Sequence, residues 1–148
     1  MKNLINFVPQ FRKKSILVIG DIMVDRFIWG NVLRISPEAP VPVVEVTKET
    51  QALGGAGNVA NNLSSLGAKV NVIAVIGDDL VGEQIRDSLK TKNIATDGIV
   101  VNDSRPTIIK TRIIAQHQQV VRVDKEIKGT FSQDIEKQLE EKISLIVP

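Results

Sequence analysis

The stretch with the strongest binding chemistry is QALGGAGNVANNLSSLG, residues 51–67. Gly54 and Gly55 stand where a helix is expected to begin, although glycine is a poor helix former. Glycines at a helix N-terminus let the backbone approach a ligand closely, and the exposed N–H groups there favour an anion or a hydroxyl-rich partner. Asn58, on the first turn, adds a donor and an acceptor aimed the same way. The alternative is that the glycine pair only permits tight packing of the helix on its strand.

Two common phosphate-binding motifs do not fit this stretch. It lacks the Gly-Lys-Ser/Thr ending of a Walker loop. It also does not follow the first predicted strand directly, as a dinucleotide fingerprint would, because thirty-three residues separate Gly20 from Gly54. The glycines are therefore expected to hold a substrate rather than an adenine dinucleotide.

The elements that position these residues follow an α/β pattern. SILVIG (15–20) and KVNVIAVIG (69–77) are short apolar runs that predict buried strands, and TDGIVV (96–101) predicts another. A helix lies between the first two runs and a second helix, over 80–92, follows them. Strand, excursion, helix, strand and helix in this order predict a doubly wound, Rossmann-like α/β fold.

The two helices carry their own start and stop signals. The first is opened by the glycine pair and stopped by Gly67, and the second can be capped by Asp78 or Asp79. Apolar residues at helical spacing predict one buried face on the first helix. The residues expected on that face are Ala56, Val59, Ala60, Leu63 and Leu66.

Two segments do not belong to this α/β layer and predict a small sheet of their own. Residues 26–47 mix β-branched and aromatic residues with polar ones and carry three prolines, which is typical of extended or edge strands. Residues 106–125 alternate over two runs separated by the polar turn AQHQQ, which predicts a β-hairpin. On that hairpin Lys110 and Arg112 share one strand face. We interpret the two segments as a β-sheet lid.

The last segment predicts an amphipathic helix followed by the start of another strand. Ser132 is a candidate cap, and Ile135, Leu139 and Ile143 form the expected buried stripe. The closing LIVP (145–148) is interpreted as the first residues of a buried strand. An α/β domain that ends where a strand should begin is expected to be a fragment of a longer domain.

The composition excludes several classes of protein. The chain has 148 residues, enough for one domain with a core of its own. Its 19 basic and 17 acidic residues leave a net charge of +2, which does not indicate a nucleic-acid partner. The absence of cysteine excludes disulfides and thiolate metal sites and suits a reducing cytoplasm. The apolar runs are far too short for a membrane span, so no membrane partner is expected.

The glycine stretch and the strand that follows it together resemble the signature of a known protein family. GGAGNVANNLSSLGAKVNVIAVIG (54–77) resembles, position for position, the N-terminal signature of the ribokinase-like (PfkB) sugar kinases. The resemblance implies a ribokinase fold, of which this chain would form a part. The matching positions are Gly54, Gly55, Asn58, Ala60, Gly67 and Gly77.

The sequences on either side of this stretch resemble one branch of that family. VIGDIMVDRFIWGNVLRISPEAPVPVVEV and PTIIKTRIIAQHQQVVRVDKE are similar to the kinase domain of D-glycero-β-D-manno-heptose 7-phosphate kinases, over roughly residues 12–148. These enzymes serve ADP-heptose synthesis for lipopolysaccharide, often beside an adenylyltransferase. The resemblance implies transfer of the ATP γ-phosphate to the anomeric hydroxyl of the sugar phosphate. Two alternatives stay open: a kinase for another sugar or sugar phosphate, and a non-catalytic module that binds a sugar phosphate or dimerises.

The resemblance also implies roles for individual residues. Asp21 occupies the place of the family's sugar-binding carboxylate, with Asp25 as a second candidate, while the glycine pair and Asn58 line the sugar site. The lid closes over the sugar and often pairs with the lid of a second subunit, which implies a homodimer. Four lid cations either hold the 7-phosphate or are solvated charges. The implied substrate-binding residues are Asp21, Gly54, Gly55, Asn58, Arg34, Lys110 and Arg112, with Arg122 and Glu38 as further candidates.

Three other residues are not expected to do chemistry. His117, the only histidine, sits in the polar turn and has no partner that would support a catalytic role. Phe27 and Trp29 are expected at lid or dimer contacts.

The sequence departs from the family pattern in what it lacks. The family's catalytic base is the Asp of a GAGD motif, which is absent here. The nucleotide-binding strands of the family also lie in its C-terminal half. The resemblance therefore implies that residues 1–148 are the N-terminal, substrate-binding half, with no catalytic residue and no metal site. ATP and Mg²⁺ would serve the full-length parent, and this chain alone is expected to bind neither tightly and to be inactive.

Overall fold

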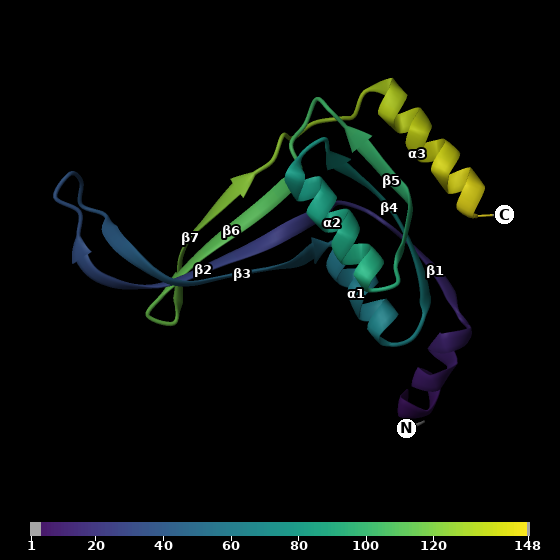
Figure 1. Ribbon diagram of the computed structural model, residues 1–148, viewed down its shortest axis with the longest axis horizontal. Coiled ribbons are helices and arrows are strands. Elements are labelled where there is room, and N and C mark those ends of the chain that lie inside the picture. Colours follow the sequence, from purple (N-terminus) through teal and green to yellow (C-terminus); the bar gives the residue numbers. More distant parts are fainter. Residues whose placement is uncertain (1–3, 148) are drawn as a thin grey trace.

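The computed structural model describes residues 4–147, which form an α/β layer and a sheet that projects from it (Figure 1). The described chain starts with a 3₁₀ helix, η1 (Leu4–Lys13), ahead of the first strand. The strands are β1 (Ser15–Ile19), β2 (Ile22–Ile35), β3 (Pro42–Gly55), β4 (Lys69–Gly77), β5 (Ala95–Asn102), β6 (Ile108–Ala115) and β7 (Gln118–Lys125). The α-helices are α1 (Ala56–Ser65), α2 (Leu80–Thr91) and α3 (Gln133–Ile146).

The α/β layer is a parallel sheet in the order β1-β4-β5, within the described residues. Helices α1 and α2 cover one face and α3 lies against the other (Figure 1). Buried aliphatic residues of β4 pack with Ile85 and Leu89 of α2 on the first face. Ile135 is the buried residue of α3. Helices on both faces of a parallel sheet confirm the predicted doubly wound α/β fold for this part of the chain. The apolar runs predicted these strands correctly because a strand buried on both faces needs apolar residues at successive positions.

The second sheet has the order β3-β2-β6-β7, and we call it the projecting sheet. β2 pairs with β3 and β6 with β7 in antiparallel fashion, whereas β2 and β6 run parallel. The β6–β7 turn holds Gln116 and His117 at φ of 50° and 66°, a conformation that a two-residue hairpin requires. The separate sheet predicted from residues 26–47 and 106–125 is present, but its first two strands are longer and run from Ile22 to Gly55.

The far end of the projecting sheet is a two-stranded ribbon. Pairing of β2 with β6 ends at Gly30 and Ala115, while β2 and β3 continue together to Ile35 and Pro42. The ribbon therefore extends beyond the β6–β7 hairpin, as Figure 1 shows. Two strands alone are only marginally stable in water, so this end has little support from the rest of the chain.

Four local expectations need correction. Gly54 and Gly55 are the last two residues of β3, and only Gly55 also serves α1, as its N-cap ahead of Ala56. Val59 is 49% exposed and Leu66 is also exposed, because α1 buries its small residues against the layer instead. Ser132 stands at the cap position of α3 without a side-chain hydrogen bond.

The fourth correction concerns the end of the chain. The strand predicted at 145–148 is wrong for its first residues, since α3 continues through Ile146 and Leu145 is 81% exposed. Pro148 lies outside the described residues. An apolar run of four residues is compatible with a strand or a helix, and here the helical period upstream continues into it.

Candidate functional site

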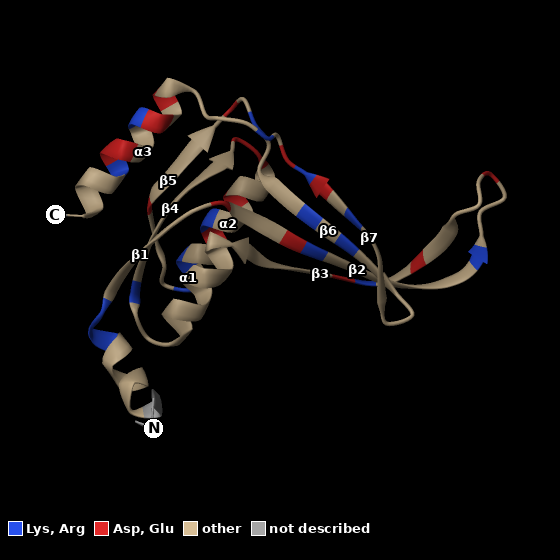
Figure 2. Cartoon of the chain, turned by 180° about the vertical axis from the view of Figure 1, so that it is seen from behind, with Lys and Arg blue, Asp and Glu red and all other residues tan. Residues whose placement is uncertain are grey.

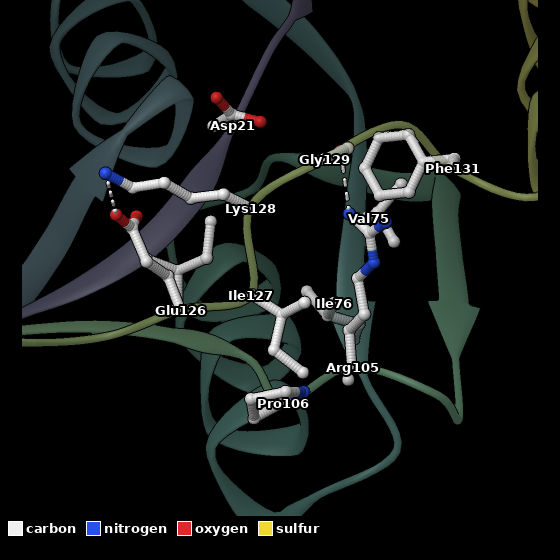
Figure 3. A pocket seen from close by; sticks show the side chains of 12 residues that line it. Asp21, Val75, Ile76, Arg105, Pro106, Glu126, Ile127, Lys128, Gly129 and Phe131 are labelled. Atoms are coloured by element: carbon white, nitrogen blue, oxygen red, sulfur yellow. Dashed lines mark hydrogen bonds and ion pairs between the residues drawn. The ribbon is translucent and has the colours of Figure 1, made fainter.

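A hollow of about 260 Å³ opens at the carboxyl ends of β1 and β4 (Figure 3). In open α/β sheets, ligands bind at this edge. Asp21 reaches the hollow from the β1–β2 connection, and Arg105 from the loop after β5. The segment from Glu126 to Phe131, between β7 and α3, forms one wall. The remaining lining residues are Val75, Ile76, Gly77, Pro106, Ile108, Ile127, Lys128 and Gly129.

Arg105 is the most firmly held cation of this hollow. Its guanidinium donates to the carbonyl oxygen of Gly129 at 3.0 Å and to that of Thr130. The guanidinium carbon also lies 4.9 Å from the ring centroid of Phe131, a cation–π distance. On the other side of the view, Lys128 lies 3.7 Å from Glu126 (Figure 3). The hollow thus has two separate positive groups.

The loop that carries Arg105 is itself fixed by hydrogen bonds. The Gly77 N–H donates to the Thr107 hydroxyl at 2.9 Å, and the Thr107 N–H donates to the Asp79 carboxylate at 2.9 Å. Burial raises the pKa of Asp79, but the hydrogen bonds from Thr107 and Gly82 outweigh it and hold that pKa below its ordinary value. Asp79 caps α2, as predicted, by accepting from the Gly82 N–H at 2.9 Å. One carboxylate therefore fixes both a helix end and this loop.

The glycine pair lies against two carboxylate-bearing segments. A Cβ atom at Gly54 would come within 2.6 Å of the Asp25 carboxylate, and one at Gly55 would come within 2.2 Å of the Asp21 carbonyl oxygen. Gly55 also has φ of 56°, which L side chains rarely adopt. The Ala56 N–H donates to the Asp21 carbonyl at 2.8 Å, so one N–H at the start of α1 is already used within the chain.

Asp25 is joined to the hairpin by an ion pair with Arg112. The Arg112 guanidinium carbon lies 5.4 Å from the ring centroid of Phe27, which itself stacks on Trp29 with centroids 6.3 Å apart. The structure thus brings Gly54, Asp25 and Arg112 together on one face of the projecting sheet. Asp25, which sequence reasoning ranked below Asp21, is the carboxylate that lies beside the glycine pair through its side chain.

Lys110 sits in a second set of ion pairs on the same face. Its ammonium nitrogen is 3.1 Å from Asp124 and 3.1 Å from Glu126, and these contacts raise the pKa of Lys110. Burial raises the pKa of Asp124, but hydrogen bonds from Lys110 and Arg122 lower it below its ordinary value. The charged residues of β6 are both basic, whereas β2 and β7 carry both acidic and basic residues, as Figure 2 shows. Glu126 links this face to the hollow, because it lines both.

Asn58 does not join these residues. It is exposed and lines a second hollow of about 370 Å³ between α1, α2 and the base of the projecting sheet. Val24 of β2 also lines that hollow, and it alternates along the strand with Asp25, which lies on the opposite face. The structure therefore separates Asn58 from Asp21.

Two candidate site residues, Arg34 and Glu38, do not line the hollow, and neither does His117, which was not expected to do chemistry. Arg34 and Glu38 are exposed on the ribbon and the loop at its tip. His117 is exposed in the hairpin turn at the opposite end of β6 from Ile108, which lines the hollow. Arg34 lies on the ribbon because β2 continues to Ile35. The length of β2 could not be predicted from the sequence, because the three prolines that follow indicated only extended or edge strands.

Sequence reasoning missed Arg105, Glu126 and Lys128. The signal for Arg105 was its place just after a predicted parallel strand, at the edge where such sheets bind ligands. No comparable signal existed for Glu126 and Lys128, because their place depends on the path between β7 and α3.

Among residues 4–147, no group of three or more His, Cys, Asp or Glu residues could hold a metal ion. No helix in the same described part of the chain is long and apolar enough to cross a membrane.

The chain resembles known proteins over most of its length. The family described as pfkB family carbohydrate kinase matches residues 13–145. A bifunctional protein HldE of Helicobacter pylori strain J99 is 57% identical over 126 residues, which cover 85% of this chain and 27% of that protein. A bifunctional protein HldE of Pelobacter propionicus is 44% identical over 143 residues, 97% of this chain and 29% of that protein. The chain thus spans less than a third of these relatives.

A solved structure shares the fold. A carbohydrate kinase from Agrobacterium tumefaciens matches with a TM-score of 0.62 at 26% identity, over 75% of this chain and 35% of that one.

Proposed function

The chain belongs to the pfkB family of carbohydrate kinases, and we propose that it is the sugar-phosphate-binding part of a heptose 7-phosphate kinase. The proposal places residues 1–148 in the N-terminal half of the kinase domain of a cytoplasmic enzyme. It combines the family match with the similarity of the sequences around β2, β3 and the β6–β7 hairpin to heptose 7-phosphate kinases. The observation that carries it is the hollow at the carboxyl ends of β1 and β4, which is continuous with the charged face of the projecting sheet through Glu126.

The reaction transfers the γ-phosphoryl group of ATP to the anomeric oxygen of D-glycero-β-D-manno-heptose 7-phosphate. A bond forms between that oxygen and the γ-phosphorus, the bond to the ADP oxygen breaks, and the hydroxyl proton leaves to a base. ATP supplies the phosphoryl group and Mg²⁺ neutralises its charge. We assign neither the base nor the nucleotide site to residues of this chain.

The residues of this chain bind and orient the sugar. Asp25 is suited to accept hydrogen bonds from sugar hydroxyls, because Gly54 leaves space for its carboxylate and Arg112 holds it. Asp21 offers a second carboxylate at the hollow. The projecting sheet acts as a lid, and its closure excludes water that would compete with the sugar hydroxyl for the phosphoryl group.

We also propose that two copies pair through the lid. The ribbon of β2 and β3 carries exposed apolar side chains at its far end, including Leu33 at 71% exposure. An isolated ribbon of this kind gains stability by pairing with another copy.

Phosphorus NMR tests the proposed reaction. The product of the whole reading frame that contains this chain is supplied with ATP, Mg²⁺ and heptose 7-phosphate, and the 148-residue chain serves as the control. A new anomeric phosphate signal is expected from the longer product. Activity on another sugar alone would keep the family and remove the heptose, and no activity on any sugar would favour a binding module.

A further inference from the structure

A phosphate dianion needs a cation that the protein has not already neutralised. Most candidates on the projecting sheet fail this requirement. Arg112 is paired with Asp25, and Lys110 is paired with both Asp124 and Glu126. Recruiting either for a phosphate means breaking an existing ion pair, which offsets much of the gain.

Arg105 meets the requirement. Among residues 4–147, no ion pair includes Arg105, and its two hydrogen-bonded partners are neutral carbonyl groups. Its full positive charge therefore stays available at the hollow. A guanidinium has five N–H donors, and the two carbonyl contacts use two of them, so three remain.

The same contacts fix the orientation of the guanidinium. Its two terminal nitrogens donate to the carbonyl oxygens of Gly129 and Thr130, and its central carbon lies over the ring of Phe131. Thr107, only 1% exposed, anchors the loop beneath it. Binding an anion then costs little side-chain entropy, and the guanidinium matches phosphate geometry better than the flexible, exposed Lys128.

We infer that Arg105 receives the phosphate group that the sugar already carries, and that it sets the preference for a phosphorylated over a free sugar. This inference rests on the proposed function, and it assigns the phosphate to a residue of the α/β layer instead of Lys110, Arg112 or Arg34 of the projecting sheet. Because Arg105 also holds the segment before α3, the occupied site would fasten the wall of the hollow.

Calorimetric titration of the 148-residue chain tests the inference. The probes are D-glycero-D-manno-heptose 7-phosphate and the unphosphorylated heptose, and the readout is the Kd of the unphosphorylated heptose divided by the Kd of the 7-phosphate. Arg105→Gln is expected to reduce this ratio by about 10- to 100-fold, the value of a charged hydrogen bond. Arg105→Lys is expected to give a smaller loss, and the exposed Arg12→Gln is expected to leave the ratio unchanged. An unaltered ratio in Arg105→Gln overturns the inference.

The ratio separates a binding role from a structural one. A purely structural arginine would weaken both ligands equally, and Phe131→Leu, which loosens the same segment, is expected to do so. If the Arg105 variants do not fold, the side-chain Nε–H signal of Arg105 in the unsubstituted chain decides. It should shift with the phosphorylated heptose and not with the free sugar, and the absence of that shift overturns the inference. If the unsubstituted chain binds neither sugar, the proposed function itself fails.

Discussion

At the scale of single residues, the glycine pair is explained by what lies against it. Gly54 is buried beside the Asp25 carboxylate, and Gly55 passes under the Asp21 carbonyl group with a positive φ. Gly55 stands at the N-cap of α1, and the first helical residue is Ala56. The role of the glycine pair is to let two acidic segments approach the turn between β3 and α1.

Gly54→Ala should therefore disturb both packing and binding. The new Cβ would sit 2.6 Å from Asp25 Oδ2 and 2.8 Å from Met23 Cγ, so side chains must shift at a cost of about 1–3 kcal/mol in unfolding free energy. Gly20→Ala is the matched control, because its Cβ meets only Ala56 at an ordinary 3.7 Å. Urea unfolding compares them. Equal stability of the two variants would contradict the close approach at Gly54.

Asp25→Asn separates binding from stability. The Asp25–Arg112 pair is about a quarter exposed, and pairs of this kind contribute about 0.2–1 kcal/mol, so the melting temperature should change little. Sugar-phosphate affinity should fall about 10-fold, because an amide accepts hydrogen bonds from hydroxyls less strongly than a carboxylate. Titration of the exposed Asp97→Asn variant provides the control. Unchanged affinity in Asp25→Asn would return the sugar-binding role to Asp21.

At the scale of elements, α2 and the loop carrying Arg105 depend on one carboxylate. Asp79 accepts from Gly82 at the helix start and from Thr107 in the loop. Asp79→Ala removes the cap and leaves a buried N–H unpaired, so the free energy of unfolding at pH 7 should fall by about 2 kcal/mol. Asp78 is adjacent and exposed, so Asp78→Ala should lower the free energy of unfolding by less than about 0.5 kcal/mol.

The effect of Asp79 should also depend on pH. Its pKa in the folded chain lies below the ordinary value of 3.8, so the unfolded chain takes up the proton first as the pH falls. Its contribution is complete above about pH 3.8 and is lost as the pH drops through the lower, folded value. Urea unfolding at pH 7 and pH 3 should show the difference between the unsubstituted chain and Asp79→Ala shrinking. A constant difference would show that Asp79 acts without its charge.

Most of these elements could be predicted from the sequence, and the failures have common causes. Periodicity identified β4, α2 and the β6–β7 hairpin because each is short, regular and bounded by turn residues. It failed at Val59, which is 49% exposed, whereas Leu63 of the same helix packs against the core as expected. Which charges meet across the projecting sheet depends on the β2–β6 register, and no local pattern encodes that pairing.

At the scale of the whole molecule, the two sheets meet the rest of a protein differently. β1 and β5 are the edges of the parallel sheet within the described residues, and α3 covers the face opposite α1 and α2. The projecting sheet leaves this layer and ends in a ribbon with nothing from residues 4–147 packed on its exposed apolar side chains. The far end of the ribbon and the outer surface of α3 thus both carry exposed apolar side chains that could associate with another copy, and substitutions can distinguish the two surfaces.

Leu33→Lys should weaken self-association through the ribbon. Leu33 is 71% exposed on β2, and a charge there opposes burial against a second copy. Leu145→Lys is the matched control, because Leu145 is 81% exposed at the end of α3, on the other side of the layer. Sedimentation velocity over a concentration series should show a shift to monomer for the ribbon variant alone, with far-UV circular dichroism unchanged in both variants. A shift for Leu145→Lys alone would place the association at α3, and the proposed lid pairing would be wrong.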